Sequence, residues 1–89
     1  MKLKEEVLLQ RVPAHLRGGI TDYVDHHIPT GSFLEAVLSN DLKEAFGRAD
    51  LESRLGMYDI VSYLFNCAPE SCWGSPEAYK AWLAKRKRE

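Results

Sequence analysis

The sequence has 89 residues, a formal net charge of −1, 45% hydrophobic residues and 28% charged residues. A chain of this length supports one domain with one core, and this composition excludes an intrinsically disordered chain. No apolar run approaches the roughly 20 residues that span a bilayer, and Glu5 and Glu6 stand where a signal peptide would be apolar. Two cysteines, Cys67 and Cys72, are too few for a disulfide framework, so a cytoplasmic location is expected.

The first part of the chain predicts a loose arm followed by a helix. The step from Val12 to Pro13 disfavours helical backbone, so residues 1–12 are expected to be loosely held. Pro13 suits the first position of a helix, and apolar residues recur after it at intervals of three and four. These intervals predict an amphipathic helix over residues 13–28.

A turn and a second helical segment follow. The residues of Pro29-Thr30-Gly31-Ser32 are typical of a turn, and Ser32 with Glu35 forms a capping box that begins a helix. The polar run Ser39-Asn40-Asp41 interrupts the apolar series before it resumes in register. The sequence leaves open whether residues 32–47 form one bent helix or two short ones.

The third segment is the most apolar. Gly47 fits the C-terminal cap of the preceding helix, and Asp50 fits the N-terminal cap of a helix that ends before Ala68-Pro69. Helical spacing predicts that its buried face consists of Leu51, Leu55, Tyr58, Val61 and Phe65, with Met57, Ile60 and Leu64 beside them. This helix is therefore expected at the centre of the protein.

The last helix has a strong start signal in Ser75-Pro76-Glu77, which combines a cap, a proline and an acid. No stretch alternates with the period of a strand. The expected fold is all-α, a compact bundle of about four helices in one domain. It would have a loose arm (1–12), a helical core (13–84) and a basic tail (85–89).

Charge is distributed unevenly along the chain. Residues 19–77 hold ten acids and three bases, while residues 1–18 carry +2 and residues 78–89 carry +4. An acidic middle would attract a basic protein partner. The predicted partner-binding surface consists of Asp22, Asp25, Asn40, Asp41, Glu44, Arg48, Asp50 and the loop residue Trp73. Local caps and an Arg48 salt bridge are the simpler explanation of its central part.

Other kinds of site have weaker signals. Thr30, Gly31 and Ser32 precede a helix and are candidates for anion binding, although the same residues form an ordinary turn. The spacing of Asp22, Asp25, His26, His27, Cys67 and Cys72 does not match a structural zinc site. The basic run Lys85–Arg88 lacks any accompanying nucleic-acid recognition motif. No cofactor, metal, membrane or nucleic-acid role is expected.

The chain resembles a group of small proteins encoded by bacteriophages and related mobile elements. The resemblance covers roughly residues 12–84 and rests on the strings IPTGSFLEAVLSNDL (28–42), GRAD (47–50) and CWGS (72–75). It implies an accessory protein acting inside a bacterial cell, and no mechanism.

Three functions remain open from the sequence. The first is a non-enzymatic protein that binds a host or phage protein, for example as an inhibitor of a defence or regulatory factor. The second is a small-ligand binder with a nucleotide or another anion at Thr30–Ser32, and the third is a metal-dependent hydrolase using Asp22, Asp25, His26 and His27. Homodimerisation is also open, because a chain this small with nine aromatic residues can leave an apolar strip uncovered.

Overall fold

The computed structural model describes the backbone of residues 2–88 and the side chains of residues 6–86. Within these residues the protein is all-helical, as the sequence predicts, but it has more helices than the expected four. The elements, in chain order, are α1 (Lys2–Arg11), α2 (Ala14–His26), α3 (Ser32–Leu38), α4 (Leu42–Arg48), α5 (Leu51–Leu55), α6 (Met57–Cys67), the 3₁₀ turn η1 (Glu70–Cys72), α7 (Pro76–Ala84) and the 3₁₀ turn η2 (Lys85–Arg88).

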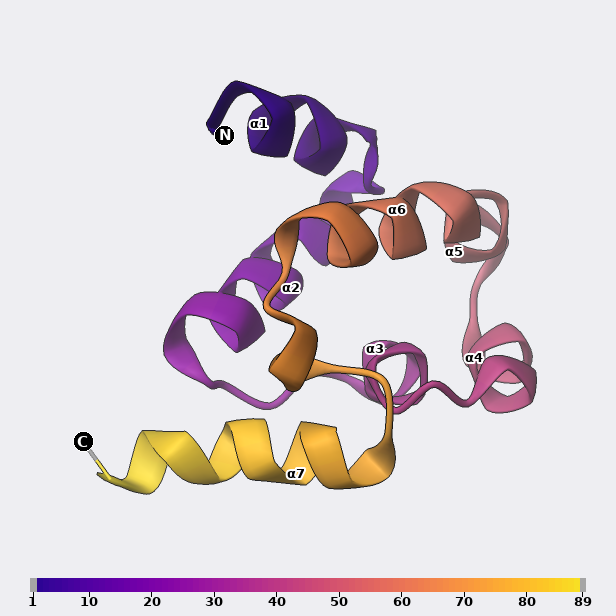
Figure 1. Ribbon diagram of the computed structural model, residues 1–89. Helices are drawn as coiled ribbons and strands as arrows, with labels where there is room; N and C mark the ends of the chain where they lie inside the picture. Colours follow the sequence, from indigo (N-terminus) through magenta and orange to yellow (C-terminus); the bar gives the residue numbers. More distant parts are fainter. Residues whose placement is uncertain (1, 89) are drawn as a thin grey trace.

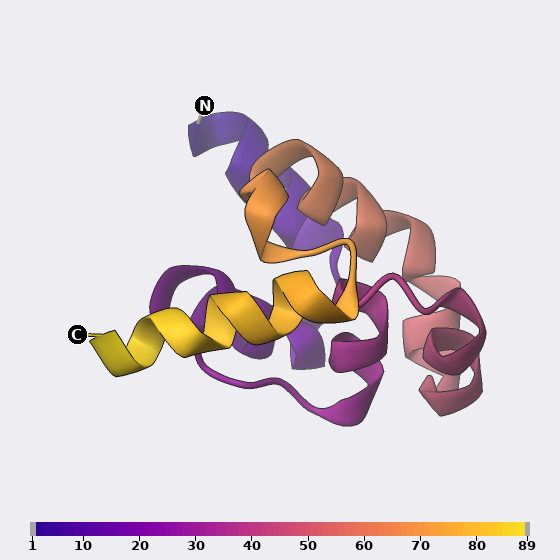
Figure 2. The same ribbon diagram turned by 60° about the horizontal axis from the view of Figure 1, so that its bottom comes forward.

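The helices form a flattened body of 36 × 32 × 19 Å. The first helix, α1, lies along α6 at one edge, and α7 lies along the opposite edge, with α2 and α3 between them (Figures 1 and 2). The segments α5 and α6 follow each other end to end, and α4 lies beside α3 at the end of the molecule far from both termini (Figure 1).

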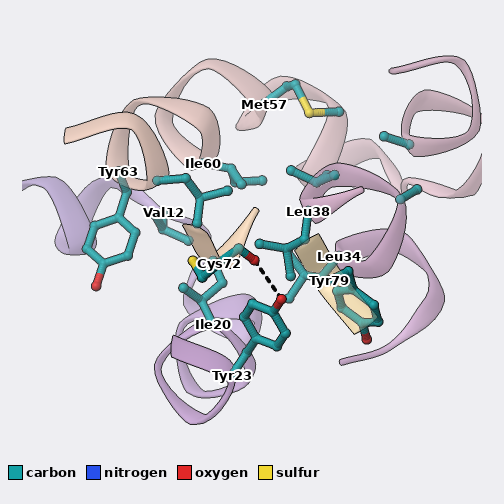
Figure 3. Close-up of a cluster of buried hydrophobic side chains, with 14 of the residues drawn as sticks. Val12, Ile20, Tyr23, Leu34, Leu38, Met57, Ile60, Tyr63, Cys72 and Tyr79 are labelled. Atoms are coloured by element: carbon teal, nitrogen blue, oxygen red, sulfur yellow. Dashed lines mark hydrogen bonds between the residues drawn. The ribbon is translucent and has the colours of Figure 1, made fainter. Parts of the chain in front are cut away.

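One core joins these elements. Its fully buried members include Ile20 and Tyr23 of α2, Leu38 of α3, and Ile60 and Leu64 of α6. Figure 3 shows Ile20, Tyr23, Leu38 and Ile60 around Cys72 of the η1 turn, and a dashed line marks the bond that the Tyr23 hydroxyl donates to the Cys72 carbonyl over 2.6 Å. This bond ties the second helix to a turn 49 residues later.

The N-terminal segment differs from the expected loose arm. Residues Lys2–Arg11 form a helix that packs along α6, with Leu8 and Leu9 against the core and Val12 fully buried. The Arg17 guanidinium also donates to the carbonyls of Val12 (2.9 Å) and Gln10 (2.6 Å), which fastens the junction. The sequence signal at Val12-Pro13 ends the helix. It does not leave residues 2–11 loosely held, because Leu8 and Leu9 pack against the core and α1 contacts α6.

Residues 32–47 form two short helices, which answers the question that the sequence left open. Asn40 adopts a left-handed backbone (φ 62°), and Asp41 then caps α4 by accepting a bond from the Glu44 N–H over 3.2 Å. The capping box of Ser32 and Glu35 is not formed, since Gly31 is the cap of α3 and no side chain caps that end. Gly47 lies inside α4, so its expected role as a C-terminal cap is also wrong.

The helix predicted over 50–67 begins at the expected cap but is divided. The Asp50 carboxylate accepts a bond from the Ser53 N–H over 2.7 Å and begins α5. The division falls at Gly56, where the backbone departs from helical geometry and where Pro13 approaches closely. A Cβ at Gly56 would lie 2.6 Å from the Pro13 Cγ, so only glycine fits without movement.

The main stripe predicted for this helix faces away from the core, whereas Met57, Ile60 and Leu64, which were predicted beside it, are buried. Its inner side chains are Met57, Ile60, Tyr63 and Leu64, while Val61 is 37% exposed and Tyr58 is 80% exposed. Leu51, Leu55 and Phe65 are each at least 70% exposed. Both faces of the segment are apolar, so helical periodicity alone does not choose which one meets the core.

The C-terminal helix agrees with its prediction. The Ser75 hydroxyl accepts a bond from the Ala78 N–H over 3.0 Å, and Pro76 occupies the first turn. Tyr79 and Trp82 are buried. Within the expected basic tail, the Lys85 ammonium lies over the Trp82 ring at 4.5 Å from its centroid. The side chains of Lys87 and Arg88, and all of Glu89, lie outside the described residues.

Candidate protein-binding surface

Large apolar side chains form an exposed surface along three consecutive helices. This apolar strip consists of Leu42 and Phe46 of α4, Leu51 and Leu55 of α5, and Tyr58, Val61 and Phe65 of α6. Their exposed fractions, 37 to 80%, amount to on the order of 800 Å² of surface. The largest apolar patch of a typical monomer is about 300–600 Å², and larger patches mark interaction sites. The strip is therefore the feature of this protein that requires a functional explanation.

Local geometry joins the α4 residues to the rest of the strip. The Arg54 guanidinium of α5 donates to the Phe46 carbonyl over 3.3 Å, which holds α4 against α5. Leu42 and Val61 line one hollow of about 240 Å³. Side chains from α4 and α6 therefore contribute to one continuous surface.

Trp73 links this hollow to a second one. The second hollow, of about 490 Å³, lies between Phe65, Glu70 and Trp73, and Trp73 and Asn40 line both. The indole packs partly on the core while part of it stays exposed, so Trp73 is both a lid and a surface residue. Its position is fixed by Gly74, which has φ 117° and donates its N–H to the Leu38 carbonyl over 2.8 Å.

The predicted acidic surface is divided among separate places. Asn40 and Asp41 lie at the strip, where they line the same hollow as Trp73. Arg48 and Asp50 line a different hollow, near the start of α3. Asp22 and Asp25 are both exposed and lie on a third element, α2.

Several of these charged groups have local structural roles. The carboxylates of Asp41 and Asp50 cap α4 and α5, and the Glu44 carboxylate accepts a bond from the Arg48 Nε over 3.1 Å. The hydrogen bond from Ser53 N–H is the main reason why the pKa of Asp50 is lowered, since it stabilises the charged carboxylate. Caps and an ion pair thus account for the centre of the predicted cluster.

The three residues of the predicted anion site do not face one common site. Thr30 is turned toward α7, where its N–H and hydroxyl both lie 3.2 Å from the Tyr79 hydroxyl. Gly31 and Ser32 instead line a hollow of about 390 Å³ together with Arg48 and Asp50. The Arg48 guanidinium is already bonded to Glu44 and to the Ser32 carbonyl, and Asp50 adds a negative charge. This arrangement gives an anion little free positive charge.

The structure brings together a polar group of four side chains, of which the sequence had singled out only Asp50. His15 Nε2 lies 3.4 Å from Asp50 Oδ2 and 3.3 Å from Ser53 Oγ, while His15 Nδ1 lies 3.3 Å from Glu52 Oε1. The serine, histidine and carboxylate superficially resemble a nucleophilic triad. However, Ser53 is only 2% exposed, so its hydroxyl is not open to a substrate, and the Asp50 carboxylate also lies at the ring nitrogen that faces it. The group links the start of α2 to the start of α5.

The cysteines and the candidate metal ligands show no shared site. Cys72 is fully buried, and burial raises the pKa of its thiol to about 11. It forms no disulfide with Cys67. Across the described residues, no three histidine, cysteine or acidic side chains are grouped so that they could hold a metal ion. The His27 ring of the proposed set packs on Trp82 at 4.6 Å between ring centroids.

Comparison with protein-family models, with curated proteins and with solved structures finds no match. Among the described helices, none has the length and apolar character needed to cross a bilayer. The site itself is therefore the basis for inferring a function.

Proposed function

We propose that this chain is a non-enzymatic protein-interaction module whose apolar strip makes the contact. The observation that carries the proposal is the exposure of Leu55, Tyr58 and Phe65, each more than 75% open to solvent on helices whose other face builds the core. Aromatic residues such as Tyr58 and Phe65 are enriched in protein interfaces, and tyrosine is among the residues that carry most of the binding energy.

Neighbouring features support a protein as the ligand. The strip runs along three helices, and the two hollows beside Trp73, of about 490 and 240 Å³, are open to solvent. Polar groups such as Asn40 and Asp41 border the apolar centre, as in the rim of an interface. The resemblance to proteins of bacteriophages and mobile elements supports a contact inside a bacterial cell.

Site-specific photocrosslinking in bacteria tests this proposal. A photoreactive phenylalanine analogue at Tyr58 is expected to form a crosslinked product with a protein, because that side chain is in the middle of the strip. The matched control places the same analogue at Asp22, an exposed position of α2 away from the strip. Mass spectrometry of the product then shows whether the bound protein is this chain or another.

Two results would contradict the proposal. One is the absence of any protein product from Tyr58, and the other is an equal yield of the same product from Asp22. Substitution of Asp41 or Asp50 with lysine is a poor alternative experiment, because both carboxylates cap helices and their loss would disturb the fold.

A further inference from the structure

We infer that the partner of the apolar strip is a second copy of this chain, which packs its α5–α6 segment antiparallel to that of the first across a two-fold axis near Tyr58. This inference rests on the proposed function, since it names the partner of the same surface. Two observations carry it: the exposed area and the spacing of the exposed side chains.

The area matches what a dimer requires. A standard interface buries about 800 Å² on each partner, which is the order of the surface that the seven side chains of the strip present. Most dimers of soluble proteins are symmetric, so one self-complementary patch is sufficient. For a protein of 10.1 kDa, pairing would cover the largest apolar area that its own core leaves open.

The spacing matches helix-to-helix packing. Leu51, Leu55, Tyr58 and Phe65 follow one another at intervals of four, three and seven residues, which is the repeat of a coiled-coil seam. The ladder of backbone bonds crosses the division between the helices, because Gly56 donates to Glu52 and accepts from Ile60, both over 2.9 Å. The two segments therefore present one extended apolar ridge to a partner.

The antiparallel direction follows from symmetry and charge. With the axis near Tyr58, Leu51 of one copy faces Phe65 of the other, so a leucine packs against a ring at both ends. A parallel pair would instead bring the two α5 starts together, with Asp50 and Glu52 of one copy beside those of the other. Antiparallel helices separate these acids and oppose their dipoles.

The charge beside the strip is mixed. Residues 41–70 hold three bases (Lys43, Arg48 and Arg54) against six acids (Asp41, Glu44, Asp50, Glu52, Asp59 and Glu70), a net charge of −3. This charge gives no attraction between two copies, so the apolar area and the spacing of the strip are what favour pairing.

Light scattering of the purified chain across a concentration series tests the dimer. The mass is expected to rise from 10.1 kDa toward twice that value. The double variant Leu55→Glu/Phe65→Glu is expected to stay monomeric, and because both positions are exposed its helical circular dichroism is expected to be unchanged. The matched control is Val7→Glu, an exposed apolar residue of α1 outside the strip, which is expected to dimerise normally.

Cysteine pairing tests the direction of the helices. In a Cys67→Ser background, Tyr58→Cys is expected to form a disulfide between copies at the axis, because a disulfide requires Cα atoms within about 7 Å of each other. Leu51→Cys alone is expected not to pair with itself, but a mixture of Leu51→Cys and Phe65→Cys chains is expected to pair. Efficient pairing of Leu51→Cys with itself would overturn the antiparallel arrangement.

The two proposals fail separately. A wild-type chain that remains monomeric at every concentration overturns the dimer. If Tyr58 then still crosslinks to a different protein in cells, the proposed interaction function stands. If the chain is monomeric and Tyr58 crosslinks to nothing, both proposals are wrong.

Discussion

Single buried residues decide how firmly distant parts of this chain are joined. Tyr23 is the best example, since its ring stacks on Tyr79 at 5.2 Å between centroids and its hydroxyl donates to the Cys72 carbonyl. The Trp82 indole adds a 2.8 Å bond to the Tyr23 carbonyl, so one residue of α2 holds both η1 and α7. Tyr23 is one of the apolar residues that recur at intervals of three and four over residues 13–28, but this spacing does not predict its partners.

Removing the Tyr23 hydroxyl tests this bond. Tyr23→Phe keeps the ring but leaves the Cys72 carbonyl buried without its donor, so the free energy of unfolding is expected to fall by about 1–3 kcal/mol. Urea denaturation measures the change. The control Tyr58→Phe, at a position 80% exposed, is expected to alter it by less than about 0.5 kcal/mol. Equal effects of the two variants would show that the Tyr23 bond contributes little.

The two cysteines are expected to differ in reactivity. Cys72 is inaccessible and its raised pKa keeps it protonated near neutral pH, whereas Cys67 is only half-buried. A thiol reagent is therefore expected to label one thiol per folded chain quickly, and the second only on unfolding. In a Cys67→Ser variant the fast labelling should disappear. Rapid labelling of that variant would place Cys72 in contact with solvent.

The raised pKa of Cys72 predicts a loss of stability at alkaline pH. The Cys72 pKa rises from 9.0 to about 11 on folding, so between these values the folded state keeps a proton that the unfolded state releases. The free energy of unfolding is expected to fall as pH rises through this interval. Denaturation below pH 9 and near pH 11 measures the change, and Cys72→Ala should reduce it. A pH-independent stability over this range would contradict the prediction.

At the scale of elements, close contact between helices fixes where they divide. Gly56→Ala places a Cβ 2.6 Å from Pro13 Cγ and 3.0 Å from its Cδ, and a rigid proline ring cannot move aside easily. The variant is expected to lose about 1–3 kcal/mol of stability. Gly18→Ala, in open space inside α2, is the control and is expected to gain about 0.5–1 kcal/mol. Thermal denaturation compares them; a stabilised Gly56→Ala would show that Pro13 does not constrain this position.

The start of α5 has a pH-dependent component. Because the Asp50 pKa is lowered mainly by the Ser53 N–H, the stability from this carboxylate is present above its unfolded pKa and is lost as pH falls through its folded pKa. Asp50→Ala is expected to be less stable than the wild type at neutral pH, with the difference narrowing in acid. Asp25→Ala, which removes an exposed carboxylate that caps no helix, is the matched control.

At the scale of the whole molecule, stability should depend on protein concentration. If two copies pair through the apolar strip, dilution favours the monomer and lowers the melting temperature by mass action. Calorimetry at several concentrations is expected to show this shift for the wild type and for Val7→Glu. The variant Leu55→Glu/Phe65→Glu should melt at one temperature throughout. A wild-type melting temperature that does not change with concentration would contradict pairing.

The sequence by itself determined the helical class, the turns near Pro29 and Pro69, and the helix starts at Asp50 and Ser75. These features depend on local chemistry, since a cap or a proline acts on its own neighbours in the chain. It also identified Asn40, Asp41 and Trp73, which lie together beside the strip, but it did not separate them from caps elsewhere.

Only the tertiary structure decided which face of residues 51–65 meets the core. Both faces of that segment are apolar, so the buried face is determined by packing against α1, α2 and η1, and not by periodicity. The helix over Lys2–Arg11 and the division at Gly56 have the same origin, because each depends on contact with a segment more than 40 residues away. The apolar strip, on which the proposed function rests, is exposed because the opposite face of the segment packs against the core.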